Sequence, residues 1–274
     1  MPDFTPNVPS ACSQLVRRVV ASNAGAMTGP GTNTYLVGID EVAVVDPGPD
    51  EAEHIDALVR AAGPDRIRWI VLTHMHHDHA GGAQRLAERT GAVIYAPTLS
   101  DHSVPATVLL EDATEIEGSE FVLRAHRTPG HTLHHVCVLL EEERALFTGD
   151  TVLEGMTTVI TPDDGDMAQY LGSLQDIASW RLRTIYPGHG AAIDDPATYV
   201  RELIDHRITR EQEIIAVIAG GTGRIGDIVA RVYPELAAPL RPVAEWQVYA
   251  HLRKLRNDGR VRGRDQRSIW VLAD

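Results

Sequence analysis

The sequence predicts an α/β protein, with a large sandwich-like domain over residues 1–205 and a small second domain over residues 206–274. Two observations predict this organisation. Short apolar runs alternate with helix-like segments through the first part of the chain, and ligand-type side chains follow several of these runs, a combination typical of layered α/β folds. The chain has 274 residues, of which 43% are hydrophobic, so it can bury one large core and one small one.

The expected elements of the first domain follow from this pattern. Strands are expected at Leu15–Val20, Thr34–Val37, Val42–Val45, Ile67–Leu72, Val93–Tyr95, Phe121–Arg124, Val136–Leu140 and Arg144–Phe147, and helices at Glu51–Ala62, Ala83–Arg89 and Met167–Ser179.

The rest of the chain is expected to form three helices and then a hairpin. The helices cover residues 195–219, Arg224–Tyr233 and Val243–Asn257, and the short strands are Gly259–Val261 and Ile269–Leu272. This is the element order of a winged helix. The alternative is a small helical cap with a hairpin and no nucleic-acid role, because such domains also cover active sites or form dimers.

The segment H-x-H-x-D-H at residues 74–79 is the strongest motif. It follows the apolar run at residues 67–72, and a loop at the carboxyl end of a strand is where α/β folds place their chemistry. Imidazole and carboxylate groups are the usual zinc ligands. The spacing allows alternate side chains to face two adjacent metal ions: His74 and His76 one of them, Asp78 and His79 the other.

Three later segments carry one further ligand-type side chain each. In each of them, apolar residues are followed by glycine and then by His131, Asp150 or His189. Glycine allows the backbone to turn sharply, so that the next side chain can point inward. A site with two metal ions needs more ligands than one loop can supply, and these three segments supply them.

Two more polar residues have open roles. Asp46 follows the apolar run Val42–Val45, and its carboxylate either orients a neighbouring ligand imidazole or belongs to an ordinary turn. His135 lies four residues after His131 and either shapes the pocket or is a histidine of the strand core.

These motifs, taken in order, resemble those of the metallo-β-lactamase superfamily. The resemblance implies a four-layer αββα sandwich with a dinuclear zinc site between two sheets. It implies that His74, His76 and His131 hold the first zinc, that Asp78, His79 and His189 hold the second, and that Asp150 bridges them. True β-lactamases commonly have cysteine in the second site, where this chain has Asp150, which argues against an antibiotic hydrolase.

A closer resemblance concerns the segment Met27–Gly38 and the long tail. Both are similar to the beta-lactamase-like endoribonuclease subfamily, which carries a winged-helix domain after the catalytic sandwich. This implies a hydrolase with two Zn²⁺ per chain that cleaves single-stranded RNA with a metal-bound hydroxide, although Mn²⁺ or Fe would also suit the ligands. Asp78 is expected to orient the hydroxide as well, and His135 is a candidate proton donor.

Two other functions are compatible with these motifs. A glyoxalase II-type thioester hydrolase shares almost every metal motif, although the basic residues that would hold a glutathione carboxylate have no clear match in the chain. The other is a nucleic-acid-binding regulator with an inert sandwich, against which the complete ligand set argues.

Charge is unevenly distributed along the chain. The net charge is −13, yet residues 206–274 carry 12 basic and 8 acidic residues, and residues 1–205 carry 13 and 30. An acidic domain repels polyanions, so the basic tail is what an RNA substrate requires. Candidate RNA-binding residues within it are Arg253, Lys254, Arg256, Arg260, Arg262, Arg264 and Arg267.

Cellular location and assembly are inferred from absent signals. Neither a signal peptide nor a run of about 18 apolar residues is evident, so we expect a cytoplasmic enzyme that does not associate with membranes. The two cysteines, Cys12 and Cys137, cannot form a disulfide framework and are expected to be reduced. A homodimer is possible through the tail.

Overall fold

The computed structural model describes residues 4–63, 65–99 and 104–273. The chain forms two compact units: Met1–Thr128, His134–Thr157 and Arg181–Pro196 make the first, and Pro129–Leu133, Thr158–Trp180 and Ala197–Asp274 the second. Helix α5 (Pro196–Ala219) runs continuously across the boundary expected at residue 205.

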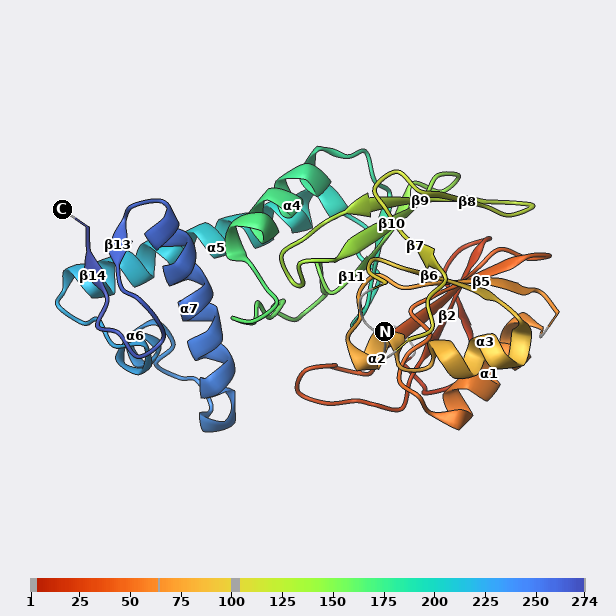
Figure 1. Ribbon diagram of the computed structural model, residues 1–274, viewed down its shortest axis with the longest axis horizontal. Coiled ribbons are helices and arrows are strands. Elements are labelled where there is room, and N and C mark those ends of the chain that lie inside the picture. Colours follow the sequence, from red (N-terminus) through yellow and green to blue (C-terminus); the bar gives the residue numbers. More distant parts are fainter. Residues whose placement is uncertain (1–3, 64, 100–103, 274) are drawn as a thin grey trace. The chain divides into compact units, whose positions relative to one another are not determined.

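The first unit contains a seven-stranded sheet whose strands follow each other in chain order (Figure 1). The strands β1 to β4 are antiparallel, whereas β4 to β7 are parallel. Their bounds are β1 (Ser10–Ala11), β2 (Val16–Val20), β3 (Asn33–Val37), β4 (Val42–Val45), β5 (Ile67–Val71), β6 (Val93–Ala96) and β7 (Val108–Leu109).

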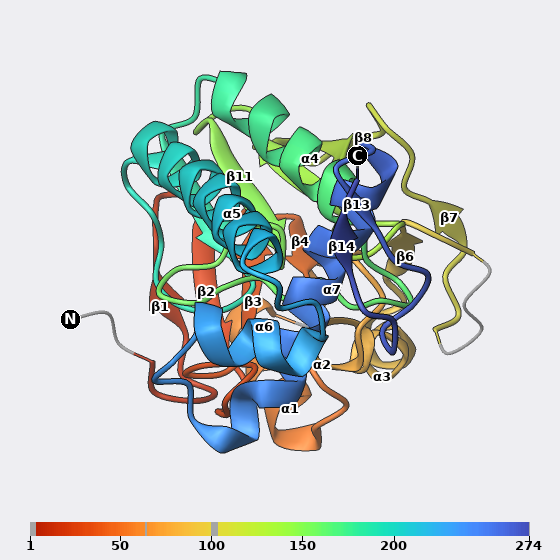
Figure 2. The ribbon, with the colours of Figure 1, turned by 90° about the vertical axis from the view of Figure 1, so that its left-hand side faces the viewer.

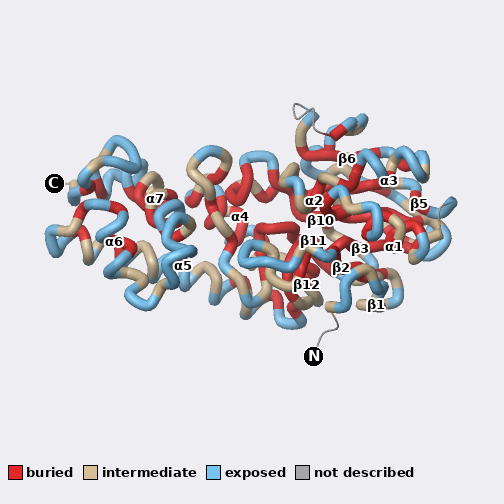
Figure 3. Tube along the Cα trace, turned by 90° about the horizontal axis from the view of Figure 1, so that it is seen from below, coloured by how far each residue is buried: buried red, intermediate tan, exposed pale blue. Residues whose placement is uncertain are grey.

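This sheet buries both of its faces. In β4, Val42 and Val44 pack into one hydrophobic cluster while Ala43 and Val45 pack into another, as the two-residue repeat of a strand requires. The helices α1 (Ala52–Ala62) and α3 (Ala83–Thr90) contribute to the cluster of Val42 and Val44. Burial on both faces explains why the central strands are continuous apolar runs, and they appear as buried stretches in Figure 3.

A second sheet of five strands packs against the other face, in the order β12-β11-β10-β9-β8. Tyr35 and Val45 of the first sheet share one core with Val138 and Phe147 of the second, so the two sheets form a sandwich. All pairs are antiparallel except β11 with β12. The bounds are β8 (Glu115–Glu117), β9 (Val122–Arg127), β10 (Val136–Leu140), β11 (Ala145–Gly149) and β12 (Thr184–Pro187).

The second unit contains the helices α4 (Met167–Ser179), α5, α6 (Ile225–Val232) and α7 (Arg241–Asn257), a short 3-10 helix (Ala238–Leu240), and the hairpin of β13 (Val261–Arg262) and β14 (Val271–Leu272). Trp270 is 1% exposed and packs with Ile228 and Leu252, so one hydrophobic core joins α5, α6, α7 and the hairpin. Figure 2 shows these helices and the hairpin. The expected order of three helices followed by a hairpin is confirmed.

Within the described residues, no helix combines the length and the apolar character needed to cross a bilayer.

Two glycine substitutions in the second unit should have opposite effects. Gly172→Ala, inside α4, should raise the free energy of unfolding by about 0.5–1 kcal/mol, because alanine is the better helix former and the added Cβ would meet no described atom within 4 Å beyond its chain neighbours and the backbone of its own helix. Gly130→Ala should lower it, because Gly130 has φ 143° and its added Cβ would lie 2.3 Å from the Cα of Tyr170. Urea unfolding followed by circular dichroism measures both, and stabilisation by Gly130→Ala would contradict this packing.

Candidate metal centre

Parallel strand pairs bring the candidate ligands to the sandwich edge. Parallel neighbours end at the same edge of a sheet, and β4 with β5 is such a pair in one sheet, as β11 with β12 is in the other. Asp46 follows β4, and the H-x-H-x-D-H segment follows β5. Asp150 follows β11 and His189 follows β12, so four motifs far apart in sequence end on two pairs of neighbouring strands.

The loops from the two sheets approach each other closely. Gly149, the last residue of β11, has φ 44°, and a Cβ added to it would lie 2.3 Å from Oγ1 of Thr73. A side chain at this position would therefore push apart the loops that carry Asp150 and His74.

The seven expected ligand residues fall in two groups, and a third group, Asp46, His74 and His79, shares one residue with each. Within each group the potential ligand atoms all lie within 4.8 Å of one another. One group is His74, His76, His131 and Asp150, and another is Asp78, His79 and His189. These are the ligand sets that the resemblance implied, apart from the bridging position of Asp150.

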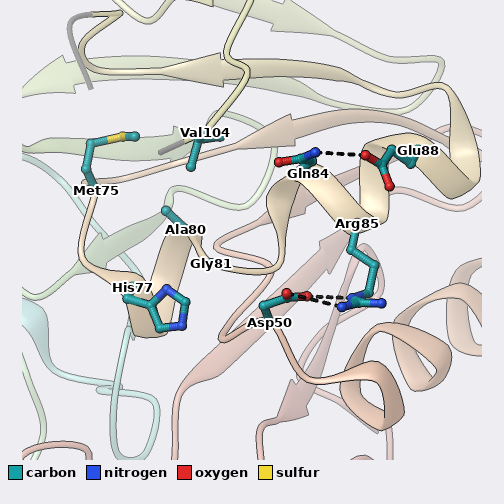
Figure 4. Close-up of a pocket in the computed structure, with 9 residues that line it drawn as sticks. All are labelled: Asp50, Met75, His77, Ala80, Gly81, Gln84, Arg85, Glu88 and Val104. Atoms are coloured by element: carbon teal, nitrogen blue, oxygen red, sulfur yellow. Dashed lines mark hydrogen bonds and ion pairs between the residues drawn. The ribbon is translucent and has the colours of Figure 1, made fainter. Parts of the chain in front are cut away.

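A one-turn helix, α2 (His77–Ala80), orients the second half of the motif. Asp78 and His79 lie on this turn and both reach the site, whereas His77 is exposed on the outer side. Figure 4 shows that His77 lines a separate pocket with Asp50 and Arg85. The helical turn, and not an extended alternation of side chains, therefore separates His77 from its neighbours.

Asp46 forms hydrogen bonds with two residues of the ligand loop, Thr73 and His79. Its side chain is 3% exposed. The carboxylate accepts hydrogen bonds from the backbone N–H of Thr73 at 2.8 Å, from the Thr73 hydroxyl at 2.7 Å and from Nδ1 of His79 at 2.9 Å. Nδ1 of His74 lies 3.0 Å from the same hydroxyl oxygen. The contacts favour the orienting role over an ordinary turn aspartate.

The hydrogen-bond network assigns the tautomers of His79 and His189. Their Nδ1 atoms face the acceptors Asp46 Oδ2, at 2.9 Å, and Gly31 O, at 3.2 Å, and so carry the proton. Their Nε2 lone pairs then converge at 3.3 Å, with Oδ2 of Asp78 3.6 Å from one and 3.3 Å from the other. Two lone pairs and a carboxylate repel one another unless a cation lies between them, so these residues fit a metal ion.

Electrostatics also favour positive charge at this point. Burial acts to lower the pKa of the His79 imidazole, but the carboxylates of Asp150 and Asp46 outweigh it and raise that pKa well above its usual value. Protons and metal ions therefore compete for the same lone pair, and metal binding should weaken at acidic pH.

His135 is fully buried beside the ligand loops. Its ring stacks on that of His74 with the centroids 5.1 Å apart. Its Nε2 accepts from the backbone N–H of Asp150 at 3.3 Å, and its Nδ1 lies 3.1 Å from the hydroxyl oxygens of Thr128 and Thr151. These contacts favour a positioning role for His135 over the expected role as a proton donor.

The segment Met27–Gly38 supports the His189 loop. Asn33, buried in β3, donates from its amide to the carbonyl oxygens of Pro187 and Gly190, each at 2.9 Å. The hydroxyl of Tyr35 donates to Pro187 O at 2.8 Å. In the sequence, this segment indicates only a resemblance to a subfamily. A buried amide following Gly-Thr could have suggested a backbone-supporting role.

The candidate RNA-binding residues of the tail differ in how far they are exposed to solvent. Arg253 donates to the carbonyl of Pro162 at 2.6 Å, and Lys254 forms ion pairs with Glu211 at 3.1 Å and Asp258 at 2.8 Å. The other five are exposed: Arg256, Arg260, Arg262, Arg264 and Arg267.

Comparison with known families agrees with the fold. The metallo-beta-lactamase superfamily matches residues 27–189, and the beta-lactamase associated winged helix domain matches residues 225–270. The chain therefore belongs to the metallo-beta-lactamase superfamily, whose fold and hydrolase character it shares. The expected αββα sandwich followed by a winged helix is confirmed.

Individual relatives cover most of the chain. A Beta-lactamase-like protein 2 homolog from Caenorhabditis elegans is 37% identical over 272 residues, which is 95% of this chain and 91% of that protein. An atrochrysone carboxyl ACP thioesterase from Aspergillus fumigatus is 37% identical over 214 residues, which is 75% of this chain and 65% of that protein. A beta-lactamase domain protein from Burkholderia ambifaria superimposes with a TM-score of 0.84 at 19% identity, covering 98% of this chain and 95% of that one.

Removing the charge of Asp46 should weaken metal binding without removing a ligand. Asp46→Asn keeps the shape of the side chain but loses the charge that orients His79, so metal affinity should fall about 10–100-fold. Competition with a chromophoric chelator measures this. The control is Asp40→Asn, the same change at an exposed aspartate of the same unit, and equal affinities in the two variants would contradict the role given to Asp46.

Proposed function

We propose that the chain is a dinuclear metal-dependent endonuclease that cleaves single-stranded RNA, with zinc as the first choice of metal. The observation that carries the dinuclear centre is the position of Asp150, which belongs to the group of His74, His76 and His131. Its Oδ1 also lies 3.2 Å from Nε2 of His79 and 3.5 Å from Nε2 of His189. Two ions held there would supply an activated water and stabilise negative charge on the attacked oxygen.

Asp78 and His135 have additional roles in the proposed reaction. Asp78 has a side chain 30% exposed, against 13% for Asp150 and 1% for His189. It is therefore the most accessible of these three and can orient a water molecule that enters from solvent. His135 accepts from the backbone N–H of Asp150 and so holds the residue that would lie between the two ions.

The RNA substrate is supported by charge on the winged helix. Residues 206–274 carry a net charge of +4, against −17 for residues 1–205. Five exposed arginines, at positions 256, 260, 262, 264 and 267, lie at the end of α7 and along the hairpin. Basic side chains on a helix and hairpin can neutralise phosphates independently of sequence. Lys254 and Arg253 are left out of this surface because they are partly buried, whereas the five arginines are exposed.

Thioester hydrolysis is the second candidate. It is favoured by the relative whose name is an ACP thioesterase, at 37% identity over 214 residues. The candidate metal ligands do not distinguish the two reactions. Metal ions held by them would stabilise charge on a carbonyl oxygen as well as on a phosphoryl oxygen.

A side-by-side assay decides between these reactions. We expect the zinc-loaded chain to cleave labelled single-stranded RNA internally, to act little on duplexes, and to leave a glutathione thioester and an acyl-carrier-protein thioester intact. Asp150→Ala should abolish cleavage and lower the metal content from about two ions per chain, as measured by plasma mass spectrometry, while circular dichroism stays unchanged.

Two outcomes would change the proposal. Rapid thioester cleavage without RNA cleavage above that of His76→Ala would make the chain a thioesterase. One ion or none in a metal-replete sample, with activity kept in Asp150→Ala, would remove the dinuclear centre.

The exposed wing arginines should control the salt dependence of RNA binding. Arg262→Glu with Arg264→Glu should weaken binding and flatten the dependence of log K on log salt, because each lost phosphate contact lowers the slope by about 0.7 for single strands. Fluorescence anisotropy at several salt concentrations measures both quantities. Metal content should not change.

The matched control makes the same charge change elsewhere. Arg181 and Arg183 are exposed in the first unit, and Arg181→Glu with Arg183→Glu should leave the slope closer to that of the wild type. If both double variants behave alike, the wing is a structural cap or a dimer contact and not an RNA-binding surface.

A further inference from the structure

Arg207, in the middle of α5, is a buried cation outside every motif of the site. It is 3% exposed. Its guanidinium donates to the carbonyl of Thr158 at 2.6 Å and to Oε1 of Gln247 in α7 at 2.9 Å. It also lies over the ring of Tyr170, 5.1 Å from the centroid. Burial of a guanidinium is unfavourable unless its donors are used, so these partners fix it at one position.

The residue after Thr158 contacts a candidate metal ligand. The carbonyl of Val159 accepts a hydrogen bond from Nδ1 of His131 at 2.7 Å. That bond leaves Nε2 of His131 as the atom that faces a metal ion. Two consecutive carbonyls therefore connect the α5 guanidinium to the His131 ring, and Arg253 of α7 holds the same segment at Pro162.

The backbone of His131 is held on the other side by α4. A Cβ on Gly130 would lie 2.3 Å from the Cα of Tyr170, and the carbonyl of Gly130 accepts from the backbone N–H of Asp166 at 2.9 Å. Because α4 fixes the backbone of this turn, the remaining freedom of His131 is the rotation of its ring. The Val159 carbonyl restrains that rotation.

We propose that Arg207 is a positioning residue of the metal centre: by holding the Thr158 carbonyl, it sets the Val159 carbonyl that orients the imidazole of His131. The inference rests on the metal centre of the proposed function and adds that the helices of the second unit, α5 and α7, determine the geometry of one of its ligands. A side chain that no metal motif contains is then required for full metal affinity.

The test compares two arginines of the same helix. Arg210 resembles Arg207 in its contacts: it donates to a backbone carbonyl, Val232 O at 3.0 Å, and lies 4.3 Å from the centroid of the Tyr233 ring. Its described contacts are with Glu213, Val232 and Tyr233, and none of these lies in the segment 158–162, so Arg210→Gln should reproduce a general loss of stability only. Arg207→Gln should lower the affinity for one of the two metal ions about 10–100-fold, and Arg207→Lys should restore part of it.

Two measurements separate positioning from stability. Titration of the full-length chain with cobalt(II), followed by its visible absorption, reports the affinity and ligand field of each ion. Solvent exchange of the His131 Nδ1 proton, followed by NMR, reports the bond to Val159 directly and does not depend on metal. We expect a changed cobalt spectrum and faster exchange in Arg207→Gln, and wild-type behaviour in Arg210→Gln.

The outcomes distinguish the inference from the function it rests on. Unchanged exchange and unchanged cobalt affinity in Arg207→Gln would overturn the inference, and so would equal changes in both glutamine variants. A wild-type chain that binds no metal would overturn the proposed function instead, and the exchange of the His131 proton would still decide whether Arg207 orients this ring.

Discussion

The metal centre depends first on the buried carboxylate of Asp46. It follows β4 with φ 50°, a left-handed conformation that aspartate tolerates better than most residues, and from there it reaches the loop after β5. Its three accepted bonds fix the backbone of Thr73 and the tautomer of His79 together. A buried carboxylate is stable only when it is satisfied in this way, so the loop and the aspartate require each other.

The same logic recurs at the other ligands. In four of the imidazoles, Nδ1 lies within hydrogen-bond distance of an oxygen atom. This oxygen is a carboxylate for His79, a hydroxyl for His74, and a backbone carbonyl for His131 and His189. These oxygens come from the segment before β3, from the residue after β4, from the segment after Asp150 and, for His74, from the neighbouring Thr73. The geometry of the centre therefore depends on several segments of the chain, because His79, His131 and His189 are each oriented by a segment distant in sequence.

The sequence revealed those parts of the site that side-chain identity determines. The apolar runs on the buried strands and the spacing of His74, His76, Asp78 and His79 were sufficient to predict the sandwich and the gathered donor groups. The very short strands β1, β7 and β8 have two or three residues, too few to show periodicity. The support from Val159 and Gly31 could not be predicted, because a backbone carbonyl has no signature in sequence, and the pairing of Lys254 with Glu211 depends on how α5 and α7 pack.

The close approach of Gly149 to Thr73 has a consequence for folding. Donor atoms of one metal group come from the loop of one sheet, at His74 and His76, and from the loop of the other, at Asp150. A bound ion would therefore act as a cross-link between the two sheets, and separating the sheets would require its release. Since a ligand that binds only the folded state stabilises it in proportion to the logarithm of its concentration, the melting temperature of this chain would report the metal supply of its surroundings.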